Sequence, residues 1–125
     1  MRRIKVTCIV CPIGCEIWVT IRGDSIKVEG NACPRGEAYA IKEATNPQRI
    51  LMTVVLVEGG HLPTVSTKTT GPIPKKLVRR AMRALARLRL RAPIKRGDIV
   101  VRNLLGLGVD VVATRTVHKL QANPR

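Results

Sequence analysis

The chain has 125 residues, of which 45% are hydrophobic, and it carries a net charge of +15. A chain of this length can form one small domain or two small lobes, and no apolar run is long enough to span a membrane. The sequence has one Trp, one Tyr and no Phe, so the core must be aliphatic. Arg outnumbers Lys, and Asn and Gln are scarce, a composition that favours a thermophile source.

Residues 3–7 alternate in polarity and predict a short strand that leads into a cysteine-rich segment. The four cysteines of the chain are Cys8, Cys11, Cys15 and Cys33, spaced C-x2-C-x3-C-x17-C. A [4Fe–4S] cluster needs four thiolates, and the short spacers allow one tightly coiled loop to supply three of them. The fourth must return from elsewhere in the fold, as Cys33 would after a hairpin. The spacing therefore predicts a metal centre.

The cysteines allow two other interpretations, disulfides and a zinc site. The sequence MRRIKVTCIV has no apolar signal-peptide core, so we expect a cytoplasmic, reducing compartment and free thiols rather than disulfides. A zinc site with four thiolates is the stronger alternative. Zinc ribbons usually supply two C-x2-C pairs, and the second pair is missing here, which favours the cluster. His61 and His118 lie far from the cysteines in the sequence and give no support to a mixed Cys/His site.

A predicted hairpin over residues 16–29, with its turn at Gly23-Asp24, joins the two cysteine segments. Trp18 follows Cys15 closely, where it would either screen the metal from water or pack in the core. Gly36 has no side chain, which would let the backbone approach the metal. Residues 37–45 predict a short helix that ends before Asn46-Pro47.

The cysteine segment resembles the N-terminal [4Fe–4S] domain of molybdopterin oxidoreductases such as formate dehydrogenase. The matching motifs are Cys8-x2-Cys11-x3-Cys15, Cys33-Pro34-Arg35-Gly36 and Asn46-Pro47-Gln48-Arg49-Ile50, and the resemblance covers about residues 6–57. It implies that the cysteines hold a cluster and that Arg35 matches the basic residue that lies between cluster and pterin. Because this chain has no room for pterin-binding domains, we expect Arg35 to raise the cluster potential through its charge instead.

Nearly the whole chain resembles a small uncharacterised family with the signature CxxCPxGC…CPRGxxYA…NPxR…PIP…GVDVVATR. Its members tend to be encoded beside flavin-dependent dehydrogenases of the anaerobic glycerol-3-phosphate dehydrogenase type. The resemblance implies that this chain is an accessory redox subunit whose partner is such a dehydrogenase.

The second part of the chain starts near Arg49. Its expected elements are strands over 50–57 and 62–69, a helix over 74–90 ended by Pro93, and strands over 99–101 and 109–113 joined by a turn at Gly106-Leu107-Gly108. The expected apolar stripe of the helix is Leu77, Val78, Ala81, Met82, Leu85 and Leu88. Residues 121–125 are expected to fray.

These patterns predict an α+β protein of two lobes. Residues 1–48 form a metal-binding lobe built from the cysteine loop and a β-hairpin, and residues 49–125 form a compact β-β-α-β-β lobe.

Positive charge is concentrated in the second half of the chain. Residues 1–62 contain 8 basic and 6 acidic side chains, a net of +2, whereas residues 63–125 contain 15 and 2, a net of +13. Lys76, Arg80, Arg83 and Arg87 lie on the face of the predicted helix opposite its apolar stripe. This face is either simply solvated, or it docks an acidic protein partner, or it contacts nucleic acid. The scarcity of aromatic side chains for base stacking disfavours nucleic acid.

No catalytic set of residues is recognisable, so we expect that the chain is not an enzyme by itself. The leading hypothesis is an electron-transfer subunit that passes electrons from the flavin of a dehydrogenase through the cluster to a carrier. The alternative is a zinc-stabilised basic module that binds nucleic acid. A third hypothesis is a cluster that only holds the fold together or senses redox state.

Overall fold

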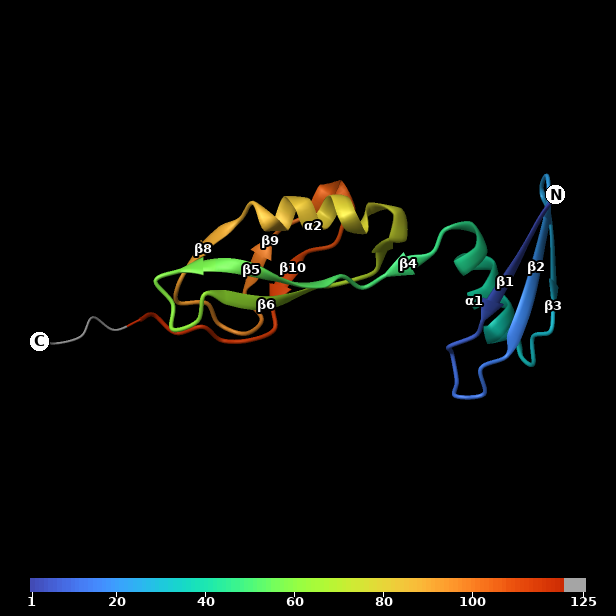
Figure 1. The fold of residues 1–125 in the computed structure, drawn as a ribbon, viewed down its shortest axis with the longest axis horizontal. Helices are drawn as coiled ribbons and strands as arrows, with labels where there is room; N and C mark the ends of the chain where they lie inside the picture. The colour runs from blue at the N-terminus through green and yellow to red at the C-terminus, as the bar shows by residue number, and fades with distance from the viewer. Residues whose placement is uncertain (121–125) are drawn as a thin grey trace, which may run out of the picture. The chain divides into compact units, whose positions relative to one another are not determined.

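The computed structural model describes residues 1–120, and these form a mixed fold of helices and strands (Figure 1). The α+β class expected from the sequence is therefore confirmed. The chain divides into two compact units, Met1–Gln48 and Arg49–Arg125. The expected fraying of residues 121–125 lies outside the described residues. Among the residues that are described, no helix combines the length and apolar character that crossing a membrane requires.

The first unit is a three-stranded antiparallel sheet with one helix packed on it (Figure 1). Strands β1 (Arg2–Thr7), β2 (Glu16–Arg22) and β3 (Ser25–Glu29) lie in sequence order, as the alternating pattern predicted. Helix α1 (Pro34–Thr45) contacts all three strands. The alternate side chains that point toward the helix are apolar and buried, and with two alanines of α1 and Cys8 they form the core of this unit: Val6, Ile17, Val19, Ala40 and Ala44.

Helix α1 begins at Pro34, earlier than the predicted start at residue 37. Cys33 is the N-cap residue, with extended backbone angles, and Pro34 follows at the start of the first turn. Proline suits this position because its fixed φ is helical and its missing N–H would have had no helical partner. Arg35 and Gly36 therefore belong to the first turn of a helix rather than to a loop.

The second unit is built on a five-stranded sheet with the strand order β8-β5-β6-β10-β9. Its strands are β5 (Met52–Glu58), β6 (Thr64–Thr69), β8 (Arg89–Arg91), β9 (Ile99–Val101) and β10 (Val111–Ala113). Strand β8 is parallel to β5, and the other neighbours are antiparallel. Helix α2 (Val78–Ala86) packs against β5. The shorter elements are β4 (Gln48–Arg49), β7 (Ile73–Pro74), η1 (Lys75–Leu77) and η2 (Leu104–Gly106).

The predicted helix over residues 74–90 was wrong at its C-terminal end. The helix stops at Ala86, and Arg89–Arg91 form strand β8, so the main sheet of the second unit has five strands where the predicted β-β-α-β-β order has four. Arg89 and Arg91 are exposed whereas Leu90 is half-buried, the alternation of a strand. Pairing with β5 satisfies the backbone of this segment, which a helical pattern in the sequence cannot reveal. Leu88 lies after the helix but still packs against the core.

The core of the second unit is aliphatic, as the composition required. Its most deeply buried side chains come from the sheet, α2 and the loops between strands: Val55, Val65, Ile73, Leu85, Leu104, Val111 and Val117. The predicted turn at residues 106–108 is confirmed, because Gly106 and Gly108 both have positive φ angles. The side-chain oxygen of Asn103 accepts a hydrogen bond of 2.8 Å from the N–H of Gly108 and holds this turn closed.

Candidate metal centre

The loop between β1 and β2 carries three of the four cysteines. Cys8 and Cys15 face each other where the two strands separate, and the N–H of Cys8 donates a hydrogen bond of 2.8 Å to the carbonyl oxygen of Cys15. Cys11 lies in the loop between them. Gly14 has a φ of +70°, which lets the backbone turn tightly back toward β2. The strand register therefore fixes Cys8 and Cys15 at the base of the loop and leaves Cys11 near its tip.

The fourth cysteine is returned to this region by the segment after β3. Gly30 has a φ of +92°, and a Cβ atom there would lie 2.5 Å from the carbonyl oxygen of Glu16, so only glycine allows so close an approach. The chain then reaches Cys33 at the N-cap of α1. Gly36 is buried in the first turn, and a Cβ atom on it would lie 3.6 Å from the sulfur of Cys8. The sulfur of Cys8 thus lies beside the first turn of the helix that Cys33 caps.

The N-terminus of α1 favours the thiolate form of Cys33. The backbone N–H of Gly36 is the main group that lowers the pKa of this thiol, although burial acts in the opposite direction. The N–H of Arg35, its guanidinium charge and its side-chain hydrogen bond lower the pKa further. Arg35 therefore contacts a predicted metal ligand directly. The Cys33-Pro34 pair is the sequence signal that could have predicted a helix start at this point.

The four thiols share one unit but do not form a closed centre. Within residues 1–120, no three His, Cys, Asp or Glu side chains are grouped closely enough to hold a metal ion. All four cysteines are free thiols, and Cys8 is buried. The donor chemistry fits a thiolate-bound metal, and Cys8 and Cys33 already converge on Gly36.

Large apolar side chains surround Cys11 on the surface. Ile9 is 74% exposed and Ile13 is 77% exposed, which is unusual for isoleucine. Val10 is exposed as well. The cysteine loop therefore presents an apolar surface next to Cys11.

Trp18 lies on the opposite face of the sheet from the cysteines. Strand alternation places Cys15, Ile17 and Val19 toward α1 and Trp18 outward. The guanidinium of Arg3 stacks over the indole ring, 4.1 Å from its centroid. The structure thus places Trp18 neither in the apolar core nor beside the predicted ligands.

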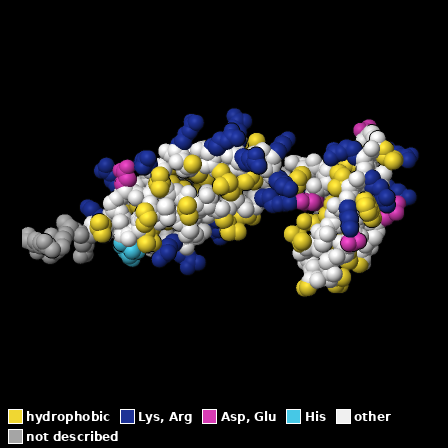
Figure 2. Space-filling view, viewed as in Figure 1, with side chains coloured by type: hydrophobic (Ala, Val, Ile, Leu, Met, Phe, Trp, Pro, Cys, Tyr) yellow, Lys and Arg dark blue, Asp and Glu magenta, His cyan; other side chains and the backbone are white. Residues whose placement is uncertain are grey.

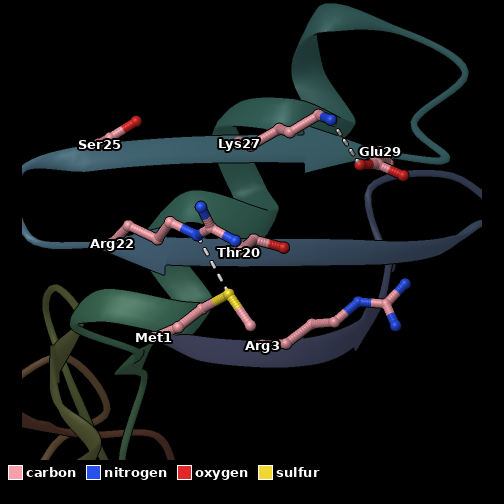
Figure 3. Close-up of a pocket in the computed structure, with 7 residues that line it drawn as sticks. All are labelled: Met1, Arg3, Thr20, Arg22, Ser25, Lys27 and Glu29. Atoms are coloured by element: carbon pink, nitrogen blue, oxygen red, sulfur yellow. Dashed lines mark hydrogen bonds and ion pairs between the residues drawn. The ribbon is translucent and has the colours of Figure 1, made fainter.

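The same outer face of the sheet holds a cavity of about 500 Å³ (Figure 3). In Figure 3, Lys27 extends toward Glu29, and the distance between the ammonium and carboxylate groups is 3.2 Å. Arg22 donates a hydrogen bond from Nε to the sulfur of Met1. Because these charged groups already contact neighbours, we interpret this face as the solvated outer surface of the sheet, on the side away from the cysteines.

The two histidines belong to the second unit and contact each other. The N–H of His118 donates a hydrogen bond of 3.0 Å to Nδ1 of His61, and the N–H of His61 donates to the carbonyl oxygen of His118. Both side chains are exposed. They fasten the chain near residue 118 to the loop after β5.

The four predicted docking residues are exposed, but they are not on one element. Lys76 lies in η1, Arg80 and Arg83 lie in α2, and Arg87 caps the helix at its C-terminus. Figure 2 shows Lys and Arg side chains gathered along the side of the second unit that carries α2 in Figure 1. No acidic residue occurs between Gly59 and Gly97, so this surface has a strongly positive field.

Comparisons with known proteins extend the description of the chain but name no activity. A family model described as "Protein of unknown function (DUF1667)" matches residues 34–115. The match begins immediately after Cys33, so it includes none of the four cysteines. The chain is similar to the NMR structure of a protein from Clostridium perfringens, with 26% sequence identity and a TM-score of 0.55, over 61% of this chain and 91% of that chain. No curated protein matches the chain.

Proposed function

The chain belongs to the family described as protein of unknown function (DUF1667), and we propose that it is an iron–sulfur electron-transfer subunit. Cys8, Cys11, Cys15 and Cys33 would hold a [4Fe–4S] cluster, which supplies reversible one-electron chemistry when bound. The observation that carries the proposal is the return of Cys33 to the cysteine loop, where its helix turn meets the sulfur of Cys8 at Gly36.

The environment of Cys33 suits a negatively charged thiolate centre. The N–H groups of the first turn of α1 and the partial positive charge of the helix N-terminus stabilise anions. Arg35 adds a full positive charge in contact with Cys33. Charge and hydrogen bonds at the sulfurs raise the potential of such centres, so Arg35 and Gly36 would tune the potential rather than take part in catalysis.

The apolar surface around Cys11 supports a role in transient protein contact. Ile9 and Ile13 expose most of their area, and exposed apolar groups beside a functional centre often mark an interface. A partner that docked there would approach the predicted centre closely. We propose that the partner is a flavin-dependent dehydrogenase of the glycerol-3-phosphate dehydrogenase type, as the sequence resemblance suggests.

The basic residues Lys76, Arg80, Arg83 and Arg87 would steer that partner if its surface is acidic. In this proposal the chain is cytoplasmic, comes from a thermophile and has no catalytic site of its own, since substrate chemistry takes place on the dehydrogenase. Electrons from the reduced flavin would pass through the centre to a separate carrier.

Purification without oxygen tests the proposal. We expect brown protein with broad absorption at roughly 400 nm and about four irons per chain, with matching acid-labile sulfide. Cys33→Ser should lose most of the iron because it removes a ligand and uncouples α1 from the centre. Ala32→Ser, which adds the same hydroxyl at the neighbouring exposed position, should retain it.

Other metal contents would decide against the cluster. One zinc per chain without sulfide would favour the alternative, a zinc-stabilised basic module that binds nucleic acid. A full cluster that no dehydrogenase flavin can reduce would favour a structural or redox-sensing centre. If Cys33→Ser kept its full iron content, Cys33 would not be a ligand.

A further inference from the structure

Strand β5 has a free edge along its first half. On one side, β5 pairs with β6 from Met52 to Leu56. On the other side, β8 pairs only with Leu56, Val57 and Glu58. Among residues 1–120, no strand of this sheet therefore covers Met52–Val55 on the β8 side. In Figure 1, β8 lies beside the C-terminal end of β5 only.

The hydrogen-bond pattern shows which backbone groups point to that edge. Thr69 donates to the carbonyl oxygen of Leu51, and Val57 donates to that of Pro63, so the odd-numbered residues of β5 bond toward β6. Ala92 donates to the carbonyl oxygen of Glu58, so the even-numbered residues face the β8 side. The N–H and C=O groups of Met52 and Val54 therefore point to the free edge.

A groove runs along the start of this edge. It has a volume of about 500 Å³ and lies between the segment Arg49–Met52 and residues 75–79, which include the start of α2. Ile50, Leu51 and Val78 give it apolar walls, and Lys75 and Arg79 contribute positive charge. Both of these cations are exposed.

The side chains beside the free edge are apolar and accessible. Met52 is 73% exposed and Val54 is 54% exposed, both on the face of the sheet away from α2. An edge with exposed apolar side chains is usually protected in proteins, because it is a template for another strand. The surrounding cations would oppose pairing with a second copy by repulsion and would attract an acidic chain.

We propose that the free edge of β5 binds an extended acidic segment of a partner protein by strand addition. The backbone of the segment would pair with Met52 and Val54. Because side chains alternate along a strand, its acidic residues would face Lys75 and Arg79 while its apolar residues lie beside Met52 and Val54. This site is separate from the cysteines, and the proposal does not depend on a bound metal.

The other occupants fit less well. A second copy of this chain would bring together two surfaces of high positive charge, since residues 63–125 carry a net of +13. Nucleic acid would match the charge, but the sequence of the second unit contains no Phe, Tyr or Trp on which bases could stack. Neither occupant explains a peptide edge that lies next to an apolar groove.

Binding of a labelled peptide to the full chain tests the proposal. The probe is a fluorescein-labelled peptide that alternates Glu and Val, measured by fluorescence anisotropy at low salt. Lys75→Glu with Arg79→Glu should weaken binding about tenfold, since it reverses both cations at the groove. Arg96→Glu with Arg102→Glu makes the same change in net charge beside β9, at the other edge of the sheet, and should alter affinity by less than about twofold.

Backbone pairing is tested separately by amide hydrogen exchange. The amides of Met52 and Val54 should exchange quickly in the free protein and become protected when the peptide is added. Those of Thr53 and Val55 bond to β6 and should be protected throughout. The same peptide with N-methyl groups on its pairing edge should bind at least about tenfold more weakly, because it cannot donate to β5.

Several results would overturn the proposal. Equal weakening by both charge-reversal pairs would show that only net charge matters. Equal affinity for the N-methylated peptide, or unchanged exchange at Met52 and Val54, would exclude strand addition. Tighter binding of a mixed-sequence RNA oligonucleotide that displaces the peptide would assign the groove to nucleic acid. A colourless, iron-free preparation would contradict the proposed function but leave this test intact.

Discussion

Cys33 receives most of its chemical character from two residues that follow it in the chain. Cys33 is the N-cap residue of α1, and the N–H of Gly36 contributes most to lowering the pKa of its thiol. Arg35 adds an N–H group and a positive charge. A helix that began at residue 37, as the sequence suggested, would have placed both residues in a loop without this effect.

The thiol of Cys33 should ionise at lower pH in the folded protein than in the unfolded chain. Since the folded state lowers the pKa, the resulting stabilisation is present above the ordinary thiol pKa and is lost as the pH falls through the lowered value. In metal-free reduced protein, alkylation of Cys33 by iodoacetamide, followed by mass spectrometry, should have its midpoint below that of the denatured chain.

Arg35→Gln should move that midpoint part of the way back, because the N–H of Gly36 remains in place. Arg2→Gln, which removes an exposed arginine from β1, is the matched control and should leave the midpoint unchanged. A midpoint that is the same in folded and denatured protein would show that the helix N-terminus does not act on Cys33.

At the scale of elements, the first unit depends on the close approach of the β3 end to the start of β2. Gly30 makes this approach possible, because any Cβ atom would meet the carbonyl oxygen of Glu16. Gly23, in the β2–β3 turn, also has a positive φ but has open space around it. Substitution of Gly23 therefore measures the free-energy cost of a left-handed backbone alone, and substitution of Gly30 adds the cost of a steric clash.

Gly23→Ala should destabilise the metal-free protein by about 1–2 kcal/mol, the cost of a left-handed conformation for a residue with a Cβ atom. Gly30→Ala should cost more, about 2–4 kcal/mol, because backbone strain and the clash with Glu16 add. Chemical denaturation of both variants measures the difference. Equal costs would mean that the segment after β3 does not lie against Glu16.

Local sequence patterns predicted the strands of the first unit. They missed strand β8 of the second unit, which depends on pairing with a distant strand. Alternation along residues 16–29 and the Gly23-Asp24 turn were sufficient for β2 and β3. Strand β8 could not be predicted in this way, since Leu85, Leu88 and their neighbours continue a helical stripe into the segment before it. Only the parallel partner β5 makes the strand favourable, and that partner is distant in the sequence.

The candidate site was predicted in the same uneven way. The sequence placed four thiols in one lobe and identified Arg35 and Gly36, but it could not show that Cys8 and Cys33 meet at Gly36. The outward position of Trp18 follows from strand alternation, because its neighbours Ile17 and Val19 point toward α1. The free edge of β5 left no local signal, because it results from the short length of β8.

Across the whole molecule, positive charge is concentrated in the second unit, whereas exposed apolar side chains occur in both units. The second half of the chain carries nearly all the net charge, whereas the exposed isoleucines next to Cys11 belong to the first unit. If a partner docks at the loop around Cys11, the long-range attraction would come mainly from the second unit and the apolar contact from the first. Charges that lie away from the contact surface raise the rate of encounter more than they tighten the complex.

If the chain docks the proposed flavin-dependent dehydrogenase, docking should be sensitive to the cations of α2. Arg83→Glu with Arg87→Glu should weaken capture of that protein about tenfold at low salt. Added salt should weaken capture of the unmodified chain in the same way, since exposed charges are screened over roughly 10 Å at about 0.1 M. Folding stability should change by less than about 0.5 kcal/mol, because both side chains are exposed. Arg96→Glu with Arg102→Glu controls for net charge, and biolayer interferometry measures all three proteins.

If the two pairs behave alike, α2 has no special role in docking. If neither pair changes capture, the cations of α2 are a solvated face, and any contact with the dehydrogenase must rest on the apolar loop around Cys11.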